Sequence, residues 1–205
     1  MVGVLKQIVQ TITGTGFLNG TQIMGLDMYL YKKTYVKQWS HQKPEDQFEV
    51  KVKRGGVTYP NIKPERVSYI QEQIMYWRKA NQIHGWFTSN TQELTEEVLY
   101  RVTLDDLKNL LDTCKQVLDV LNKSKMKTVQ VRSGWSGGQE TYSDVETYDC
   151  VDEVMELLPP TQGFFYGSDE IDEWYKQSIE ETVEFLEKEI PLCTDDDEFE
   201  YYGSW

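Results

Sequence analysis

One segment of the chain combines aromatic, cationic and hydrogen-bonding side chains at helical spacing. It covers residues 76–87 and contains Trp77, Asn81 and His84, which are separated by four and then three positions. This spacing places the three side chains on one face of an α-helix, and that face changes from apolar to polar where the helix is expected to end. Because buried polar groups are costly unless they are hydrogen-bonded, Asn81 and His84 either face a ligand or bond to nearby backbone.

The functional interpretation of this segment is a ligand-binding site. Asn81 and His84 would supply directed hydrogen bonds, Trp77 and Trp86 would form the walls, and Arg78 would lie at the rim, where it could pair with an anion. Aromatic walls with a few polar groups are typical of small-ligand sites. The competing interpretation is structural, since polar residues near helix ends commonly satisfy backbone groups.

A catalytic interpretation uses the same residues. His84 would act as general acid or base, and Arg78 or Lys79 would steady an anionic substrate. However, the sequence contains no nucleophile-elbow motif and no cysteine with a credible histidine partner. We therefore favour a protein that does no chemistry and keep the enzyme as an alternative.

The remaining motifs give no support for a metal or a cofactor. Two histidines and three widely spaced cysteines do not form a zinc-ligand pattern. The glycine-rich residues 133–138 match neither the P-loop pattern nor the dinucleotide-binding fingerprint. We expect a hairpin loop there, with no metal and no cofactor.

Alternating apolar and polar residues indicate a small sheet. Residues 26–31 and 128–132 alternate as half-buried strands do. Residues 48–59 alternate on both sides of Gly55-Gly56, which supplies the positive φ angles of a tight hairpin turn.

Helical spacing and capping residues indicate about four helices, and the sequence therefore predicts an α+β fold with a small antiparallel sheet that contains a hairpin. The clearest helix follows Thr103, which forms a variant capping box with Asp106. The expected helices start at Pro64 and end near residue 85, follow Thr103, cover residues 149–158, and run from Ser168 to Pro191.

The net charge of −13 is concentrated near the end of the chain. Residues 169–200 hold 14 acidic and 2 basic side chains. The expected organisation is a flexible N-terminal arm over residues 1–23, a single α+β domain over residues 24–192, and an acidic mobile tail over residues 193–205.

Composition also restricts the location and the partners. No apolar run approaches the roughly 20 residues that a membrane span needs, so we expect no membrane partner. The odd number of cysteines forms no disulfide framework, which favours a cytoplasmic protein. The basic N-terminal third lacks a recognition motif, which disfavours nucleic acid as a partner.

Three segments together resemble a known group of proteins. They are residues 24–30, residues 76–87, and residues 163–168 running into residues 172–175. These segments resemble a group of small uncharacterised proteins from bacteriophages and bacterial genomes, over most of residues 24–190. The resemblance implies a phage or mobile-element setting and brings no activity, cofactor or catalytic residue with it.

The sequence thus favours a non-catalytic, phage-type accessory protein that binds a small molecule or a host protein. The first alternative is the enzyme that uses His84. The second is an acidic inhibitor of a protein interaction, which would act through the last helix and the tail. Ligand uptake without turnover would indicate the binding protein, and product formation would indicate the enzyme. Salt-sensitive binding to a basic partner would indicate the inhibitor.

Overall fold

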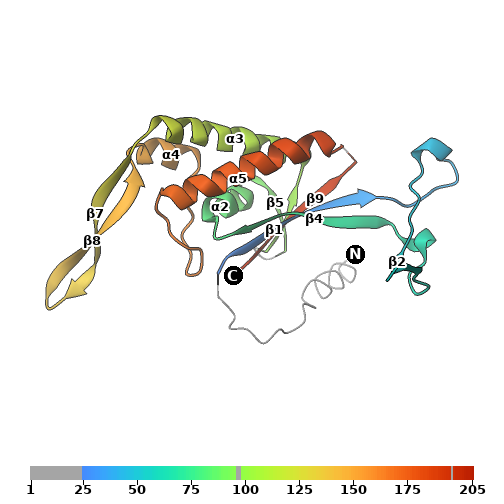
Figure 1. The fold of residues 1–205 in the computed structure, drawn as a ribbon, viewed down its shortest axis with the longest axis horizontal. Coiled ribbons are helices and arrows are strands. Elements are labelled where there is room, and N and C mark those ends of the chain that lie inside the picture. Colours follow the sequence, from blue (N-terminus) through green and yellow to red (C-terminus); the bar gives the residue numbers. More distant parts are fainter. Residues whose placement is uncertain (1–24, 96–97, 195) are drawn as a thin grey trace.

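A five-stranded antiparallel sheet forms the centre of the molecule (Figure 1). The computed structural model describes residues 25–95, 98–194 and 196–205, so the expected arm over residues 1–23 lies outside the described residues. In spatial order the strands are β4 (Tyr69–Arg78), β1 (Asp27–Tyr35), β9 (Glu198–Ser204), β6 (Leu99–Val102) and β5 (Gln92–Thr95). The predicted α+β class is confirmed.

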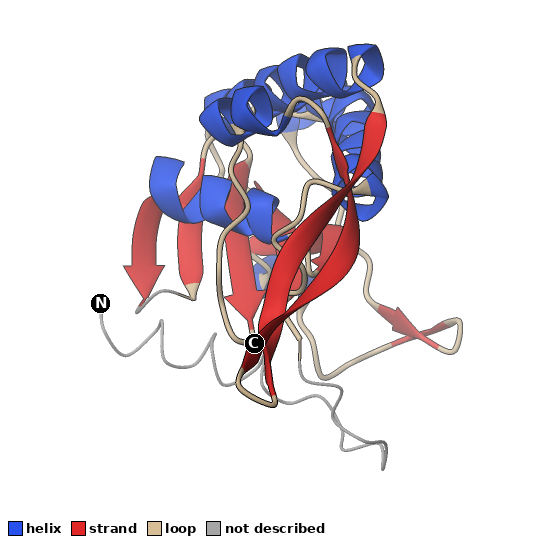
Figure 2. Ribbon diagram, turned by 90° about the vertical axis from the view of Figure 1, so that its left-hand side faces the viewer, coloured by secondary structure: helices blue, strands red, loops and turns tan. Residues whose placement is uncertain are grey.

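Helices lie over one face of this sheet, as Figures 1 and 2 show, and the short helix over residues 151–157 packs against the long helix that follows Thr103. The predicted helix after Thr103 is confirmed, because the Thr103 hydroxyl accepts from the Asp106 N–H while the Asp106 carboxylate accepts from the Thr103 N–H. This reciprocal capping satisfies two backbone donors at the helix start. The helices are α2 (Asn81–Asn90), α3 (Leu104–Lys123), α4 (Val151–Leu157) and α5 (Glu173–Glu189).

The core lies between the sheet and the helices. Met28 and Leu30 of β1 are fully buried, and they alternate with half-buried tyrosines on the opposite face of the strand. This is the period-2 pattern of a strand with one covered face. Helices α3 and α5 complete the core with residues at helical spacing, among them Leu110 and Ile179.

The expected helix from Pro64 is wrong. Pro64–Arg66 is a single 3₁₀ turn, and the following residues form strand β4, which pairs with β1 over its whole length. The register shifts once along this pair, where Leu30 lies opposite Met75 and Tyr31 lies opposite Gln73. Such a bulge adds a residue to one strand and resets its alternation, so the apolar spacing of a bulged strand imitated that of a helix.

The expected mobile tail is also contradicted. Residues Glu198–Ser204 form β9, which pairs with β1 on one side and β6 on the other. Phe199 and Tyr201 are buried in the core, and the acidic residues Glu198 and Glu200 alternate with them. The carboxylates therefore belong to one face of a central strand.

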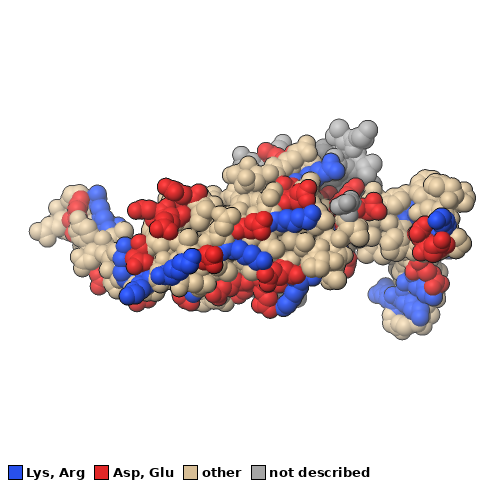
Figure 3. Space-filling view, turned by 90° about the horizontal axis from the view of Figure 1, so that it is seen from above, with Lys and Arg blue, Asp and Glu red and all other residues tan. Residues whose placement is uncertain are grey.

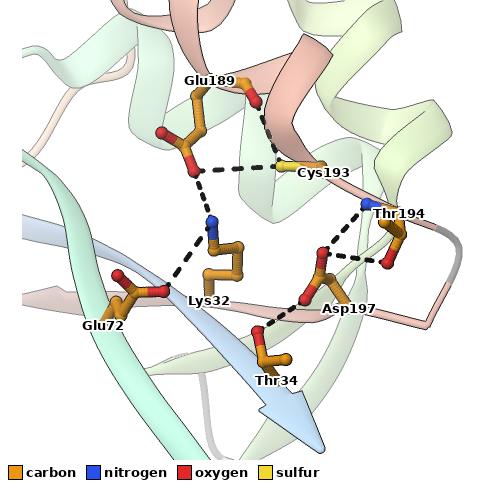
Figure 4. A network of polar contacts seen from close by, with 7 residues as sticks. All are labelled: Lys32, Thr34, Glu72, Glu189, Cys193, Thr194 and Asp197. Carbon is orange, nitrogen blue, oxygen red and sulfur yellow. Dashed lines mark hydrogen bonds and ion pairs between the residues drawn. The ribbon is translucent and has the colours of Figure 1, made fainter. Parts of the chain in front are cut away.

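A network of polar side chains fixes the approach to β9 (Figure 4). The Lys32 ammonium lies 2.7 Å from Glu189 and 3.8 Å from Glu72. Asp197 accepts hydrogen bonds from the Thr34 hydroxyl at 2.6 Å and from the Thr194 N–H at 2.9 Å. These contacts tie the end of α5 and the start of β9 to the adjoining strands.

Two hairpins project from opposite ends of the molecule (Figure 1). The longer one joins β7 (Met126–Ser136) and β8 (Gln139–Tyr148), and it contains the glycine-rich residues in which a hairpin loop was predicted. The shorter one joins β2 (Lys53–Arg54) and β3 (Val57–Thr58) through Gly55 and Gly56, as predicted. Both turns use glycines with positive φ, which side chains disfavour.

The last helix begins later than expected. Its N-cap is Asp172, whose carboxylate accepts from the Tyr175 N–H at 2.9 Å, rather than Ser168. Residues 159–172 therefore form a long loop that returns across the start of α2.

Within the described residues, no helix combines the length and the apolar character that a membrane crossing requires.

Candidate functional site

The segment singled out from the sequence is divided between a strand and a helix. Trp77 and Arg78 end β4, whereas Asn81, His84 and Trp86 belong to α2. Trp77 is buried, and its indole N–H donates to the Thr182 hydroxyl of α5 at 2.9 Å. The break between the two elements separates side chains that a continuous helix would have aligned.

Asn81 holds the long loop against the start of α2. Its amide nitrogen donates to the Ser168 carbonyl at 2.7 Å, and its amide oxygen accepts from the Thr161 N–H at 3.2 Å. The side chain is only 2% exposed. Satisfied buried amides of this kind fix backbone geometry, so the geometry gives Asn81 a structural role.

His84 lies in a buried aromatic cluster. Its Nδ1 shares a hydrogen bond with the Tyr201 hydroxyl at 2.7 Å, and its Nε2 shares one with the Tyr166 hydroxyl at 3.2 Å. The Trp205 ring packs edge-on at 5.5 Å between ring centroids. Burial lowers the pKa of His84 to about 4, because a desolvated imidazole resists charging. His84 is therefore a neutral packing residue at physiological pH.

Trp86 is a residue of the same helix as His84, α2. It is buried and packs edge-on against Phe87, with ring centroids 5.4 Å apart. The structure thus places Trp77 and Arg78 beside an open groove, while Asn81, His84 and Trp86 lie in the packed interior.

The groove lies between the end of β4 and the first half of α5, and we call it the β4–α5 groove. It has a volume of about 530 Å³. One wall is the end of β4 with the residues that follow it, and the other is α5 with the loop before it. Its lining includes Tyr76, Trp77, Arg78, Lys79, Gln82, Ser168, Glu170, Asp172, Trp174, Ser178 and Glu181.

The two walls carry opposite charges. Arg78 and Lys79 extend from the β4 side, while Glu170, Asp172 and Glu181 belong to the loop and α5. By contrast, basic and acidic residues are interspersed over the molecular face seen in Figure 3. The segregation of charge inside the groove could therefore orient a bound molecule.

Lys79 has an unusual backbone conformation. It is the one non-glycine residue of the described chain with a positive φ, at 58°. Its N–H donates to the Leu26 carbonyl at 2.8 Å, which continues the β1–β4 pairing past the end of the strand. A left-handed conformation costs a non-glycine residue about 1–2 kcal/mol, and such strain tends to concentrate at functional sites.

Gly167 allows the loop to approach Lys79. A Cβ atom at Gly167 would lie 3.1 Å from the Lys79 Cβ, and the glycine has a φ of 96°. The loop backbone at Gly167 therefore lies against the aliphatic part of the Lys79 side chain beside the groove.

Trp174 lines the groove but was not among the site residues predicted from the sequence. This side chain is 77% exposed at the mouth of the groove, while its neighbour Tyr175 is buried and donates to the Leu158 carbonyl at 2.6 Å. Adjacent helical residues point about 100° apart, so only one of the two could lie at the centre of the buried face. The adjacent rings of Trp174 and Tyr175 were therefore the signal in the sequence that one of the two faces outward.

No group of three or more potential metal ligands occurs among the described residues.

Comparison of the chain with protein-family models, with curated proteins and with solved structures finds no match. The geometry of the β4–α5 groove is consequently the main basis for a functional proposal.

Proposed function

We propose that the protein is a non-catalytic binding protein and that the β4–α5 groove is its ligand site. The observation that carries this proposal is an open groove of about 530 Å³ that joins exposed aromatic surface to segregated charges. Ligand pockets of about 300–1,000 Å³ typically combine apolar walls with a few directed polar groups. Trp174 supplies the exposed ring, and Arg78, Lys79 and Glu181 supply the charges.

The enzymatic alternative has less support. His84 is buried and neutral, and its two ring nitrogens already have hydroxyl partners. A general acid or base must come within hydrogen-bond reach of its substrate, and His84 does not line the groove.

The cellular setting is part of the same proposal. The resemblance to bacteriophage and bacterial proteins supports an accessory role in a phage or mobile element. All three cysteines are free, which is compatible with the reducing cytoplasm.

Binding can be tested with ¹⁵N-labelled protein and a defined panel of probes: the free amino acids, the common mononucleotides and a set of short peptides. We expect at least one probe to shift the amide resonances of Ser168 and Trp174. Trp174→Ala should weaken this binding without unfolding the protein, because the ring is mainly exposed. Trp135→Ala is the matched control, since Trp135 is 62% exposed on the β7–β8 hairpin.

Lys79→Gly tests the strained corner of the site. The substitution removes the ammonium group. It also relieves the strain of a positive φ, because glycine adopts this backbone conformation readily. We expect weaker binding together with an unchanged or higher melting temperature. Binding that survives both Lys79→Gly and Trp174→Ala, or resonance shifts confined to other surfaces, would refute the proposed site.

A further inference from the structure

Strand β4 presents a backbone edge to the groove. It is an outer strand of the sheet, with β1 on one side and no other described strand on its second side. The Lys79 N–H donates to the Leu26 carbonyl, and Trp77, two residues before Lys79, lies opposite Met28. In an antiparallel pair, alternate residues exchange backbone hydrogen bonds with the partner strand. The N–H and C=O of Tyr76 therefore point to the outer edge, along the wall of the groove.

The opposite wall is acidic. Helix α5 contains six acidic and two basic residues. Of the groove carboxylates, neither Glu170 nor Glu181 forms an ion pair with another described residue, although Glu181 accepts a hydrogen bond from Gln177 at 2.9 Å. These carboxylates attract a cation, and the exposed Trp174 ring beside them offers a face on which a cation can lie.

We propose that the groove binds an extended peptide that carries lysine or arginine, and that the peptide adds as a further strand to the outer edge of β4 beside Tyr76. This inference rests on the proposed function, because it names the ligand class of the same groove. Main-chain hydrogen bonds to β4 supply sequence-independent affinity, and contacts of alternate side chains supply specificity. A basic side chain that points toward α5 meets Glu181 and Trp174.

The charge of the chain favours the same ligand. The net charge of −13 is concentrated in the part of the sequence that includes α5, so a basic peptide is attracted before contact at low ionic strength. Arg78 and Lys79 lie on the strand side of the groove and repel a basic residue there. Peptide side chains that alternate between the two walls are thus sorted by charge.

The peptide Ac-Thr-Lys-Thr-Lys-Thr-Lys-NH₂ tests this inference against two matched peptides. In one, alternate backbone nitrogens are methylated, which blocks strand pairing but keeps every charge. In the other, glutamate replaces lysine. We expect the first peptide to bind, to slow amide hydrogen exchange at Tyr76, and to lose affinity as salt is added. Each altered peptide should bind at least about tenfold more weakly, because each lacks one of the two interactions.

Variants on α5 separate the groove from the general charge of the helix. Glu181→Gln should weaken binding of the basic peptide about threefold to fivefold, as expected for one partly exposed ion pair. Glu187→Gln is the matched control, because Glu187 lies on the same helix but pairs with Lys115 at 2.8 Å outside the groove. Equal effects of the two variants would overturn the assignment to this groove.

The outcomes also distinguish this inference from the proposed function. Equal binding of the methylated and unmethylated peptides would overturn strand addition. If no peptide binds while a free amino acid or a mononucleotide shifts the groove resonances, the groove is a ligand site and the peptide inference is wrong. If no probe shifts those resonances, both are wrong.

Discussion

The stability of the fold is expected to decrease as the pH falls below neutrality. Replacing His84 with glutamine should remove most of this pH dependence. Burial lowers the pKa of His84 to about 4 in the folded protein, whereas an exposed histidine has a pKa of 6.5. Below pH 6.5 the unfolded chain binds a proton that the folded protein does not accept. Stability therefore falls as the pH decreases, and the loss from this residue levels off only below about pH 4.

The size of the effect follows from the two pKa values. Between pH 7.5 and pH 5.5, protonation of the unfolded chain should cost about 1.4 kcal/mol of folding free energy. Carboxylates with ordinary pKa values stay largely ionised over this interval, so His84 dominates the change. Urea unfolding followed by tryptophan fluorescence at the two pH values measures it.

The comparison uses the change with pH within each protein. His84→Gln lowers the absolute stability, because glutamine does not reproduce the ring contacts with Tyr166, Tyr201 and Trp205, but its stability should change little over the interval. His41→Gln removes the other histidine, from an exposed loop, and should keep the wild-type pH dependence. An equal loss in the wild type and in His84→Gln would refute the reasoning.

Three further predictions concern stability. Tyr201→Phe leaves the buried His84 Nδ1 without its hydroxyl partner and should cost about 1–3 kcal/mol in chemical unfolding, whereas Tyr202→Phe, on the half-exposed face of β9, should cost under about 0.5 kcal/mol. Thr103→Ala removes the capping box of α3 and should lower the unfolding free energy by about 1 kcal/mol; an unchanged unfolding midpoint would contradict the capping role. Deletion of residues 198–205 removes the central strand, so the product should show no cooperative thermal transition by circular dichroism, and a cooperative one would contradict the sheet order.

Local signals made part of the fold predictable. The Thr103 capping box and the Gly55-Gly56 turn act within a few residues, so the sequence contains most of the information that determines them. The two mistaken segments depend on pairing between distant residues. β4 carries a bulge that disturbs its alternation, and the clear alternation of β9 was obscured by an interpretation based on its acidic residues.

The candidate site was less predictable, for a physical reason. Trp77, Asn81 and His84 share a face only if one helix contains all three, and the chain instead changes from strand to helix at Lys79-Ala80. The groove brings the end of β4 together with α5, which lies about 100 positions later in the sequence. No local pattern specifies that juxtaposition.

The most direct measurement of the central claim is fluorine NMR of protein labelled with 5-fluorotryptophan, with resonances assigned by single substitutions to phenylalanine. Trp174 lies at the mouth of the β4–α5 groove, and Trp135, which is also mainly exposed, is the reference on the β7–β8 hairpin. Titration with the free amino acids, the mononucleotides and the Thr-Lys hexapeptide should shift the Trp174 resonance with at least one probe and leave Trp135 unchanged. A Trp174 resonance that no probe moves, or a probe that shifts Trp135 instead, would contradict the assignment of the groove as the binding site.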